Sequence, residues 1–456
     1  MGTLLVKNAK QLLTMDETRR KIADGAIFVR DNVIAAVGPT RDLPARADRV
    51  IDASRMVVLP GLINTHHHLY QTLTRAVPAV QNAELFDWLV YLYPLWAELD
   101  AEAVYTSALI GLAELLLSGC TTVSDHLYLV PHDSAHDDEI RAARELGMRF
   151  HPCRGSMSLG KSQGGLPPDS VVETEEDIIA DCERLFDAYH DPNPYSMLRI
   201  VVAPCSPFSV TGESMRRSAA WARERGLTMH THVAETLDEE RFCIERFGAR
   251  PVEYMRRLDW VGPDVWYAHA IHLDAAEITL LAATGTGVAH CPSSNMRLGS
   301  GIAPIREMIA AGVRVGLGVD GSASNDSSHM LAEARMALLL QRVTKGATAL
   351  TVDEALELGT LGGARVLGRD DLGAIAPGKA ADFIGVDLDR VEYAGAACHD
   401  PAGSLILCTP PTVDLSVVNG RVVVEDGYIP GLDLARLIAR QNEIALEMVR
   451  KREERG

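Results

Sequence analysis

The chain has 456 residues, of which 47% are hydrophobic and 23% are charged, and its formal net charge is −18. This size and composition are typical of a globular protein with one large domain or two of moderate size. Polynucleotides and anionic membranes repel so acidic a chain, so we expect neither as a partner and favour a small substrate that is neutral or cationic.

Nothing in the chain indicates export or membrane insertion. The first residues, MGTLLVKNAKQLLTMDETRR, lack the basic-then-apolar pattern of a secretory signal, and no later run reaches the roughly 20 apolar residues of a membrane helix. The eight cysteines are scattered without a CxxC pair, which favours reduced core residues over a disulfide scaffold. We therefore expect a cytoplasmic protein.

The two ends of the chain share one pattern. Residues 1–58 contain short alternating apolar segments such as GAIFVRDNVIAAVG, where the Asp-Asn dipeptide at 31–32 predicts a hairpin turn. Residues 374–430 repeat this pattern, with a second turn predicted at the Asn-Gly dipeptide 419–420. We expect both ends to form one small, discontinuous β-sandwich domain.

Residues 59–373 change to short buried strands that alternate with amphipathic helices. Eight segments are predicted strands: VVLPGLINTHH, TTVSDHL, MRFHPCR, LRIVVAP, LTMHTHV, VWYAHAI, GVAHCPS and RVGLGVDG. One of the helices between them, TEEDIIADCERLFDAYH, is expected to be capped by Thr174. Eight apolar strands joined by helices predict an α/β fold, a (β/α)8 TIM-type barrel. Residues 431–456 predict a C-terminal helix.

Polar residues gather at the predicted strand ends. His66 and His68 end the first strand, and His67 between them should point to the other side, because side chains alternate along a strand. His232 ends the fifth strand, and His269 lies in the second half of the sixth. In a barrel all these ends form one mouth, where such enzymes carry their chemistry.

Asp320 ends the eighth strand and completes a predicted metal site. The predicted ligands of one divalent metal are His66, His68, His232 and Asp320, which match the nitrogen and oxygen donors that Zn²⁺ prefers. Fe²⁺ and Mn²⁺ also occupy such sites, so the metal stays open, with Zn²⁺ favoured. A site with two metal ions would need an extra bridging ligand, such as a modified lysine in the fourth strand. The predicted fourth strand, LRIVVAP, has no lysine, so we expect one metal ion. We expect hydrogen-bonded core positions for the histidines His67, His126, His272 and His290.

Glu235 follows His232 by three residues in HTHVAET, just beyond the fifth strand. From there its carboxylate can reach a metal-activated water without being a ligand, which is the position of a general base. The residue also suits the first turn of a helix, where negative charge is favourable. The two roles are compatible.

Five separated motifs, LPGLINTHHH, HTHVAET, AHAIHL, GVDGSASND and LGAIAPGKAADFIGVDL, resemble the amidohydrolase superfamily. They resemble its mononuclear cyclic-amidine deaminase branch over nearly the full length. The resemblance implies that His66, His68, His232 and Asp320 bind the metal, that Glu235 shuttles the proton, and that His269 orients the water or substrate. It also implies attack of a metal-activated water on an amidine carbon, and a homodimer.

Several segments narrow the expected substrate. NTHHHLYQTLTRAVPA, ELFDWLVYLYPLWA and RGSMSLGKSQGGLPPDSVVE are similar to bacterial 8-oxoguanine deaminases, whereas SMSLGKSQGG and SASND also resemble triazine hydrolases. A chlorohydrolase can lack one catalytic carboxylate, because chloride leaves unprotonated, whereas a leaving amine needs a proton. Since Glu235 and Asp320 are both present, the resemblance favours a deaminase that converts 8-oxoguanine and water to urate and ammonia.

Other substrates stay open. The alternatives are a hydroxyatrazine aminohydrolase or chlorohydrolase, and a deaminase of isoxanthopterin, isocytosine or guanine. In nucleoside and S-adenosylhomocysteine deaminases a histidine that contacts the ribose typically stands where APCSPFSV has Cys205, so a ribose is not expected. An inactive barrel that serves in assembly is disfavoured, because such proteins typically lose metal ligands.

Substrate contacts are expected near the mouth. Gln71 offers a donor and an acceptor to a lactam edge, and Cys205 is either a contact or a small apolar filler. Trp88 and Tyr91 suit stacking on a planar ring, although an aromatic pair in a helix also suits the core. Contacts are also expected from Arg154 and Ser156, after the third strand.

Overall fold

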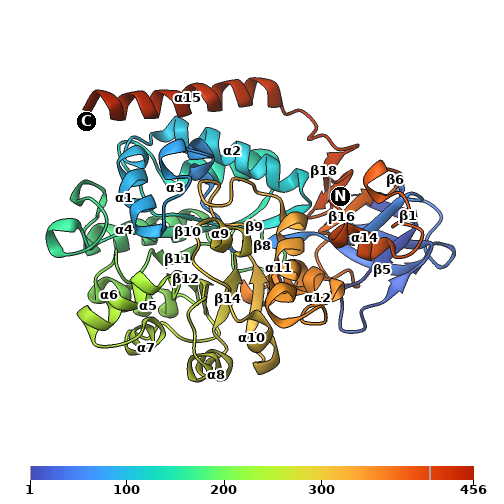
Figure 1. Ribbon diagram of the computed structural model, residues 1–456. Coiled ribbons are helices and arrows are strands. Elements are labelled where there is room, and N and C mark those ends of the chain that lie inside the picture. Colours follow the sequence, from blue (N-terminus) through green and yellow to red (C-terminus); the bar gives the residue numbers. More distant parts are fainter. Residues whose placement is uncertain (1, 410–411, 456) are drawn as a thin grey trace.

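A computed structural model describes residues 2–409 and 412–455 (Figure 1). Eight parallel strands close into a barrel in the order β10-β11-β12-β13-β14-β15-β8-β9. These strands are β8 (Leu62–Asn64), β9 (Cys120–Leu127), β10 (Arg149–Ser156), β11 (Val201–Pro204), β12 (Thr228–Val233), β13 (Val265–His269), β14 (Gly287–His290) and β15 (Arg314–Leu317). The TIM-type barrel predicted from the alternating pattern is confirmed.

Helices follow the barrel strands and surround the barrel (Figure 1). They are α1 (Leu85–Trp96), α2 (Ala101–Leu117), α3 (His136–Leu146), α4 (Glu175–Tyr189), α5 (Gly212–Glu224), α6 (Leu237–Phe247), α7 (Pro251–Arg257), α8 (Ala275–Thr284), α9 (Pro292–Arg297), α10 (Ile305–Ala311), α11 (Met330–Lys345), α12 (Val352–Glu357) and α13 (Gly363–Val366). The Thr174 hydroxyl accepts a hydrogen bond from the Asp177 N–H and caps α4, as its sequence predicts.

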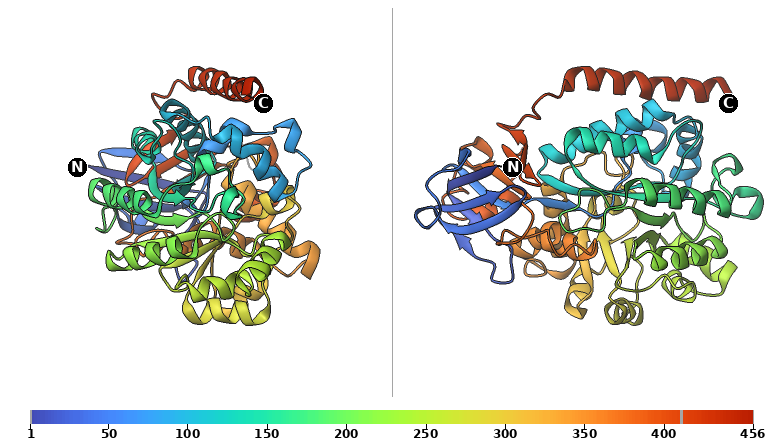
Figure 2. Two further views of the ribbon diagram at one scale, coloured as in Figure 1. Left: turned by 90° about the vertical axis from the view of Figure 1, so that its left-hand side faces the viewer. Right: turned by 180° about the vertical axis from the view of Figure 1, so that it is seen from behind.

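Two further sheets, built from both ends of the chain, lie together beside the barrel (Figure 2). One has the order β5-β4-β1-β6 and the other the order β18-β17-β16-β7-β2-β3. Their strands are β1 (Thr3–Ala9), β2 (Gln11–Leu13), β3 (Lys21–Ile22), β4 (Gly25–Arg30), β5 (Val33–Pro39), β6 (Arg49–Asp52), β7 (Met56–Pro60), β16 (Phe383–Asp387), β17 (Leu415–Val418) and β18 (Arg421–Glu425). One buried cluster joins both sheets and includes Val6, Ile27 and Phe383.

The first predicted barrel strand is divided in the structure. In VVLPGLINTHH, β7 pairs with β16 and β2 of the six-stranded sheet, and only β8 enters the barrel, between β15 and β9. The expectation of one continuous strand was therefore wrong. The hydrophobic run is unbroken because both halves are buried, so its pattern does not reveal the change of sheet.

Both predicted hairpin turns are present, and they contact each other. Asp31 (φ 58°) joins β4 to β5, and Asn419 (φ 50°) with Gly420 (φ 77°) joins β17 to β18. A Cβ on Gly420 would lie 2.2 Å from the Asp31 carbonyl oxygen, so only glycine fits there. The contact ties the first part of the chain to the last.

The remaining helices are α14 (Pro401–Leu407) and α15 (Leu434–Arg455). The predicted C-terminal helix is α15, which runs over the outside of the barrel near α2, with the chain termini far apart (Figures 1 and 2). In the described part of the chain, no helix is long and apolar enough to cross a membrane.

Candidate active site

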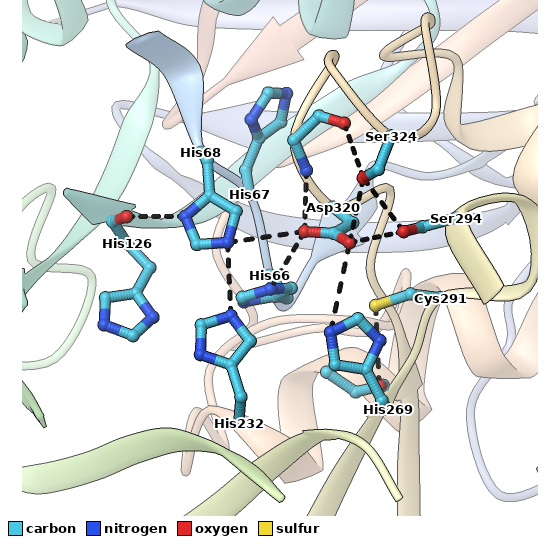
Figure 3. Close-up of polar contacts among 12 residues, drawn as sticks. His66, His67, His68, His126, His232, His269, Cys291, Ser294, Asp320 and Ser324 are labelled. Atoms are coloured by element: carbon cyan, nitrogen blue, oxygen red, sulfur yellow. Dashed lines mark hydrogen bonds and ion pairs between the residues drawn. The ribbon is translucent and has the colours of Figure 1, made fainter. Parts of the chain in front are cut away.

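The predicted metal ligands lie together at the carboxyl ends of the barrel strands (Figure 3). His232 and His269 are in the last two residues of β12 and β13, and Asp320 follows β15 by three residues. His66 and His68 follow β8 by two and four residues, so they belong to the loop after the strand rather than to its end. The barrel brings these five residues to one mouth.

The candidate ligand atoms face one another at short distances. The His68 Nε2 lies 3.2 Å from the His232 Nε2 and 3.4 Å from the Asp320 Oδ1. The His66 Nε2 lies 3.2 Å from the same Asp320 oxygen. Four tetrahedral ligands about 2.0–2.1 Å from Zn²⁺ would stand about 3.3 Å apart. The spacing therefore fits one ion at the centre of the four residues.

Hydrogen bonds on the outer side of two imidazoles leave the inward nitrogens without hydrogen. The His68 Nδ1 donates to the His126 carbonyl at 2.6 Å, and the His232 Nδ1 donates to the Cys205 carbonyl at 2.7 Å. A carbonyl only accepts, so Nδ1 carries the hydrogen in each neutral ring. The lone pairs of the two Nε2 atoms then face each other.

His66 is oriented by a relay through His230. The His230 Nδ1 donates to the Trp266 carbonyl at 3.0 Å, so the His230 Nε2 accepts from the His66 Nδ1 at 2.8 Å. Burial holds the pKa of His66 well below its usual value, so its Nε2 presents a lone pair to Asp320. Three lone pairs and a carboxylate aimed at one point repel each other, and a cation between them removes the repulsion. The residues present therefore fit a divalent metal.

Asp320 is held by three hydrogen-bond donors. The hydroxyls of Ser294 and Ser324 donate to its Oδ2 at 2.6 and 3.2 Å, and the Gly321 N–H donates to its Oδ1 at 2.7 Å. Hydrogen bonds to the charged form favour ionisation, and the pKa of Asp320 lies well below its usual value despite burial, which alone would raise it. The carboxylate is therefore ionised.

Glu235 and His269 stand beside the metal-ligand set. The His269 Nε2 lies 3.5 Å from the Glu235 Oε2 and 3.9 Å from the Asp320 Oδ2. Burial raises the pKa of Glu235 to about 7, where a carboxyl group can both accept and give a proton at neutral pH. Glu235 precedes Thr236, the cap residue of α6, so the alternative of a first-turn helix residue was wrong.

Left-handed backbone conformations recur in the site. Ala234 (φ 56°), His269 (φ 72°) and Asp320 (φ 63°) all adopt this region, which is rare outside glycine. Each such residue costs about 1–3 kcal/mol, and strain of this kind concentrates at functional sites. All three lie where a barrel strand ends and the chain turns at the mouth.

A cavity opens onto these groups. It is lined by His68, Gln71, Leu85, Trp88, Leu89, Tyr93, Tyr128, Cys205, Ser206, Phe208, His232, Glu235, Leu298, Asp320 and Ser324. A few convergent polar groups among apolar and aromatic walls are typical of a small-molecule site.

Three of the predicted substrate contacts line this cavity, and the others do not. Gln71, Trp88 and Cys205 are among its walls, whereas Arg154 and Ser156 are absent from them.

Arg154 lies in an ion-pair network outside the cavity. Its guanidinium lies 2.6 Å from a Glu173 carboxylate oxygen and 2.8 Å from one of Asp181. Neighbouring side chains of a barrel strand point to opposite faces, and that of Arg154 turns toward α4. The expectation of a substrate contact is therefore corrected. Tyr91 is also outside the cavity, with the Arg452 guanidinium 3.7 Å from its ring centroid.

Tyr93 is a cavity residue that sequence reasoning missed. Its hydroxyl is buried and has no hydrogen-bond partner among the described residues, and the same holds for the Gln71 Oε1. A buried polar atom without a partner costs about 1–3 kcal/mol, so these two atoms mark places where a ligand can bind. The spacing of the residues in the sequence could have indicated this position. Leu85, Leu89 and Tyr93 recur every four residues and therefore lie on one face of α1, the face that lines the cavity.

Two further histidines, His230 and His126, lie next to the candidate metal ligands. His230 was not predicted, although it shares the alternating pattern of HTH with His232. His126 has a ring nitrogen within 4.8 Å of those of His66, His68 and His232, and its Nε2 donates to the Ala203 carbonyl at 2.7 Å. His67 points away from the cluster (Figure 3), with its Nε2 2.9 Å from the Ser328 hydroxyl.

Residues 57–423 match the model of the Amidohydrolase family. The chain is 51% identical over 430 residues to 8-oxoguanine deaminase of Pseudomonas aeruginosa, which covers 94% of this chain and 95% of the relative. It is 41% identical over 453 residues to hydroxydechloroatrazine ethylaminohydrolase of Pseudomonas sp. strain ADP, covering 95% and 93%. The crystal structure of an atrazine chlorohydrolase from Arthrobacter aurescens TC1 complexed with zinc superposes with a TM-score of 0.92 at 36% identity, covering 97% of this chain and 100% of that one.

Proposed function

The chain belongs to the amidohydrolase family, and from this we propose that it is a metal-dependent deaminase that converts 8-oxoguanine and water to urate and ammonia. The observation that carries the substrate is the 51% identity to an 8-oxoguanine deaminase over 94% of this chain. The family and the deaminase relatives make the protein a hydrolase that acts on C–N bonds.

We assign the metal to His66, His68, His232 and Asp320. The support is their mutual spacing of 3.2–3.4 Å and the inward lone pairs of the three imidazoles. We propose Zn²⁺, because the donor set suits it and a related chlorohydrolase was solved with zinc. When bound, such an ion lowers the pKa of water from about 15.7 to about 7 and so provides a nucleophile at neutral pH.

The side chains around the metal would move the protons. Glu235 takes one proton from the water and delivers it to the ring nitrogen of the amidine as the water oxygen bonds to C2. Asp320 transiently accepts the second proton, which passes to the exocyclic amine as the C2–N bond breaks and ammonia leaves. His269, 3.5 Å from Glu235, orients the reacting groups.

The cavity would orient the base. The amide of Gln71, whose oxygen has no partner among the described residues, offers an acceptor and donors to a lactam edge. The Tyr93 hydroxyl, also without a partner there, offers a second polar contact. Trp88 and Phe208 form flat apolar walls that suit a planar ring.

One experiment tests this proposal directly. Ammonia release is measured from the zinc-loaded protein with 8-oxoguanine, guanine, isocytosine and isoxanthopterin, alkylamine release with a hydroxytriazine that bears an alkylamine, and chloride release with a 2-chlorotriazine. We expect 8-oxoguanine to have the highest kcat/KM. Glu235→Gln should lower its kcat about 10²- to 10⁴-fold, the usual contribution of a general acid–base residue.

Two outcomes would contradict the proposal. Faster turnover of the hydroxytriazine would favour the second candidate, an aminohydrolase of triazines, which the 41% identity to a hydroxydechloroatrazine ethylaminohydrolase supports. Chloride release that survives Glu235→Gln would identify a chlorohydrolase, because chloride needs no proton to leave.

A further inference from the structure

A buried carboxylate of α6 binds the backbone that carries Glu235. Glu239 lies in the first turn of α6 and is fully buried. Its Oε1 accepts a hydrogen bond from the Ala234 N–H and its Oε2 accepts one from the Glu235 N–H, both at 2.8 Å. Glu239 is absent from the cavity lining, so it acts on the site through these two amides.

This arrangement differs from ordinary helix capping. Thr236 and Glu239 have the spacing of a capping box, in which the glutamate accepts from the N–H of the cap residue. Thr351 and Glu354 form such a box in α12, where the Thr351 N–H donates to Glu354 at 2.8 Å. The Glu239 carboxylate instead reaches past Thr236 to the two preceding amides, so its bonds serve the turn before the helix.

The turn held in this way is strained. Ala234 has a φ of 56°, which costs a non-glycine residue about 1–3 kcal/mol. On its other side the Ala234 carbonyl accepts from the Ile271 and His272 N–H groups at 2.8 and 3.0 Å. The peptide groups are thus fixed from both sides, which sets the direction in which the Glu235 side chain leaves the backbone.

We propose that Glu239 is a positioning residue that keeps the Glu235 carboxylate in place for proton transfer. This inference rests on the proposed role of Glu235. Proton transfer requires donor and acceptor atoms about 2.6–3.2 Å apart, and a displacement of about 1 Å can cost about 10²-fold in rate. Without the two hydrogen bonds, the strained turn would relax and move Glu235 away from the reacting atoms.

Glu239→Gln tests the inference with little change of shape. The substitution replaces one acceptor oxygen with an NH₂ group, which opposes one of the two backbone N–H donors. We expect kcat for ammonia release to fall about 10²-fold, with KM and the metal content of the purified protein unchanged. The matched control is Glu354→Gln, which alters an ordinary capping box far from the site and should leave kcat unchanged.

A double-variant cycle separates positioning from a general structural role. Because Glu239 acts through Glu235, adding Glu239→Gln to the Glu235→Gln protein should lower kcat no further. The inference would be overturned if Glu239→Gln lowered kcat by the same factor in the wild type and in the Glu235→Gln protein. It would also be overturned if the Glu239→Gln single variant lost its metal. If Glu239→Gln does not fold, Glu239→Asp, which is too short to reach both amides, undergoes the same tests.

Amide hydrogen exchange gives a readout that needs no substrate. The segment 233–236 should exchange faster in Glu239→Gln than in the wild type and in Glu354→Gln. Unchanged exchange would overturn the inference whatever the substrate is. If the wild type released no ammonia from 8-oxoguanine, the proposed function would be wrong. Faster exchange in Glu239→Gln would then still support the role of Glu239 in holding the turn.

Discussion

Each imidazole of the proposed metal site has one nitrogen fixed by a partner outside the site. His68 and His232 donate to backbone carbonyls, whereas His66 donates to His230, which is itself held by the Trp266 carbonyl. Such outer partners set the tautomer and hence which nitrogen is free for the metal. The relay through His230 is the one link of this kind made by a side chain, so substitution can test it.

His230→Phe should weaken metal binding. The substitution removes the acceptor for the His66 Nδ1–H, so neither tautomer nor ring orientation of His66 stays fixed. We expect the affinity for Zn²⁺ to fall about 10- to 100-fold, as is usual for outer partners of metal ligands. Competition with a chromophoric chelator measures it, and affinity equal to that of the wild type would show that the relay is dispensable.

Tyr93→Phe should separate binding from stability. The hydroxyl has no partner among the described residues, so its removal should leave the unfolding temperature unchanged or raise it. If the hydroxyl contacts the substrate, KM for 8-oxoguanine should rise about tenfold, since one lost hydrogen bond costs about 1.4 kcal/mol. Calorimetry and steady-state kinetics check both values, and an unchanged KM would make Tyr93 only a wall of the cavity.

The candidate catalytic residues lie just beyond the ends of helices and strands. Glu235 stands between β12 and α6, and Asp320 follows β15, so neither side chain is fixed by regular secondary structure. Their positions depend on left-handed turns and on hydrogen bonds from neighbouring elements. The same reliance on special turns appears far from the site, where the Asp31 and Gly420 turns meet.

Gly420→Ala should destabilise the protein more than Gly431→Ala. Both glycines have similar positive φ, 77° and 84°, but a Cβ on Gly420 would meet the Asp31 carbonyl oxygen at 2.2 Å, whereas nothing lies within 4 Å of one on Gly431. Gly431→Ala should therefore cost only the backbone penalty of about 1–2 kcal/mol. Urea unfolding of the two variants measures the difference, and equal losses would show that the two turns separate readily.

Across the whole molecule, the proposed metal site spans the seam of the barrel with the fewest paired residues, between β8 and β15. Strands β15 and β8 pair at a single position, where Leu317 lies opposite Asn64. His66 and His68 follow β8 and Asp320 follows β15, so an ion bound by them would connect the two sides of the seam. The first and last strands of the barrel are thus joined where the chemistry is proposed to occur.

Metal removal should lower stability and loosen this seam. An ion that binds only the folded protein stabilises it by about 2.7 kcal/mol at 100 times its dissociation constant. We expect chelation to lower the unfolding temperature and to speed amide exchange in β8 and β15 more than in β10 and β11. Added Zn²⁺ should restore both. Equal changes in all four strands would contradict a specific role at the seam.

Local signals in the sequence determined much of the fold. The Asp-Asn and Asn-Gly turns, the Thr174 cap and the alternation of strands with helices each depend on residues a few positions apart, so their chemistry can be seen in the sequence. The same holds for the pairing of His66 with His68 and for the carboxylate of Glu235 three residues after His232. These patterns predicted the barrel and the residues that the structure brings together at its mouth.

Only the tertiary structure decided how these groups are oriented. The His66 tautomer depends on His230, which is 164 positions away, and the outward direction of Arg154 depends on its ion pairs with Glu173 and Asp181. The unpaired hydroxyl of Tyr93 shows only once its surroundings are assembled. Hydrogen bonds and burial join residues that are distant in the chain, so their effects on a site exist only when the barrel has closed.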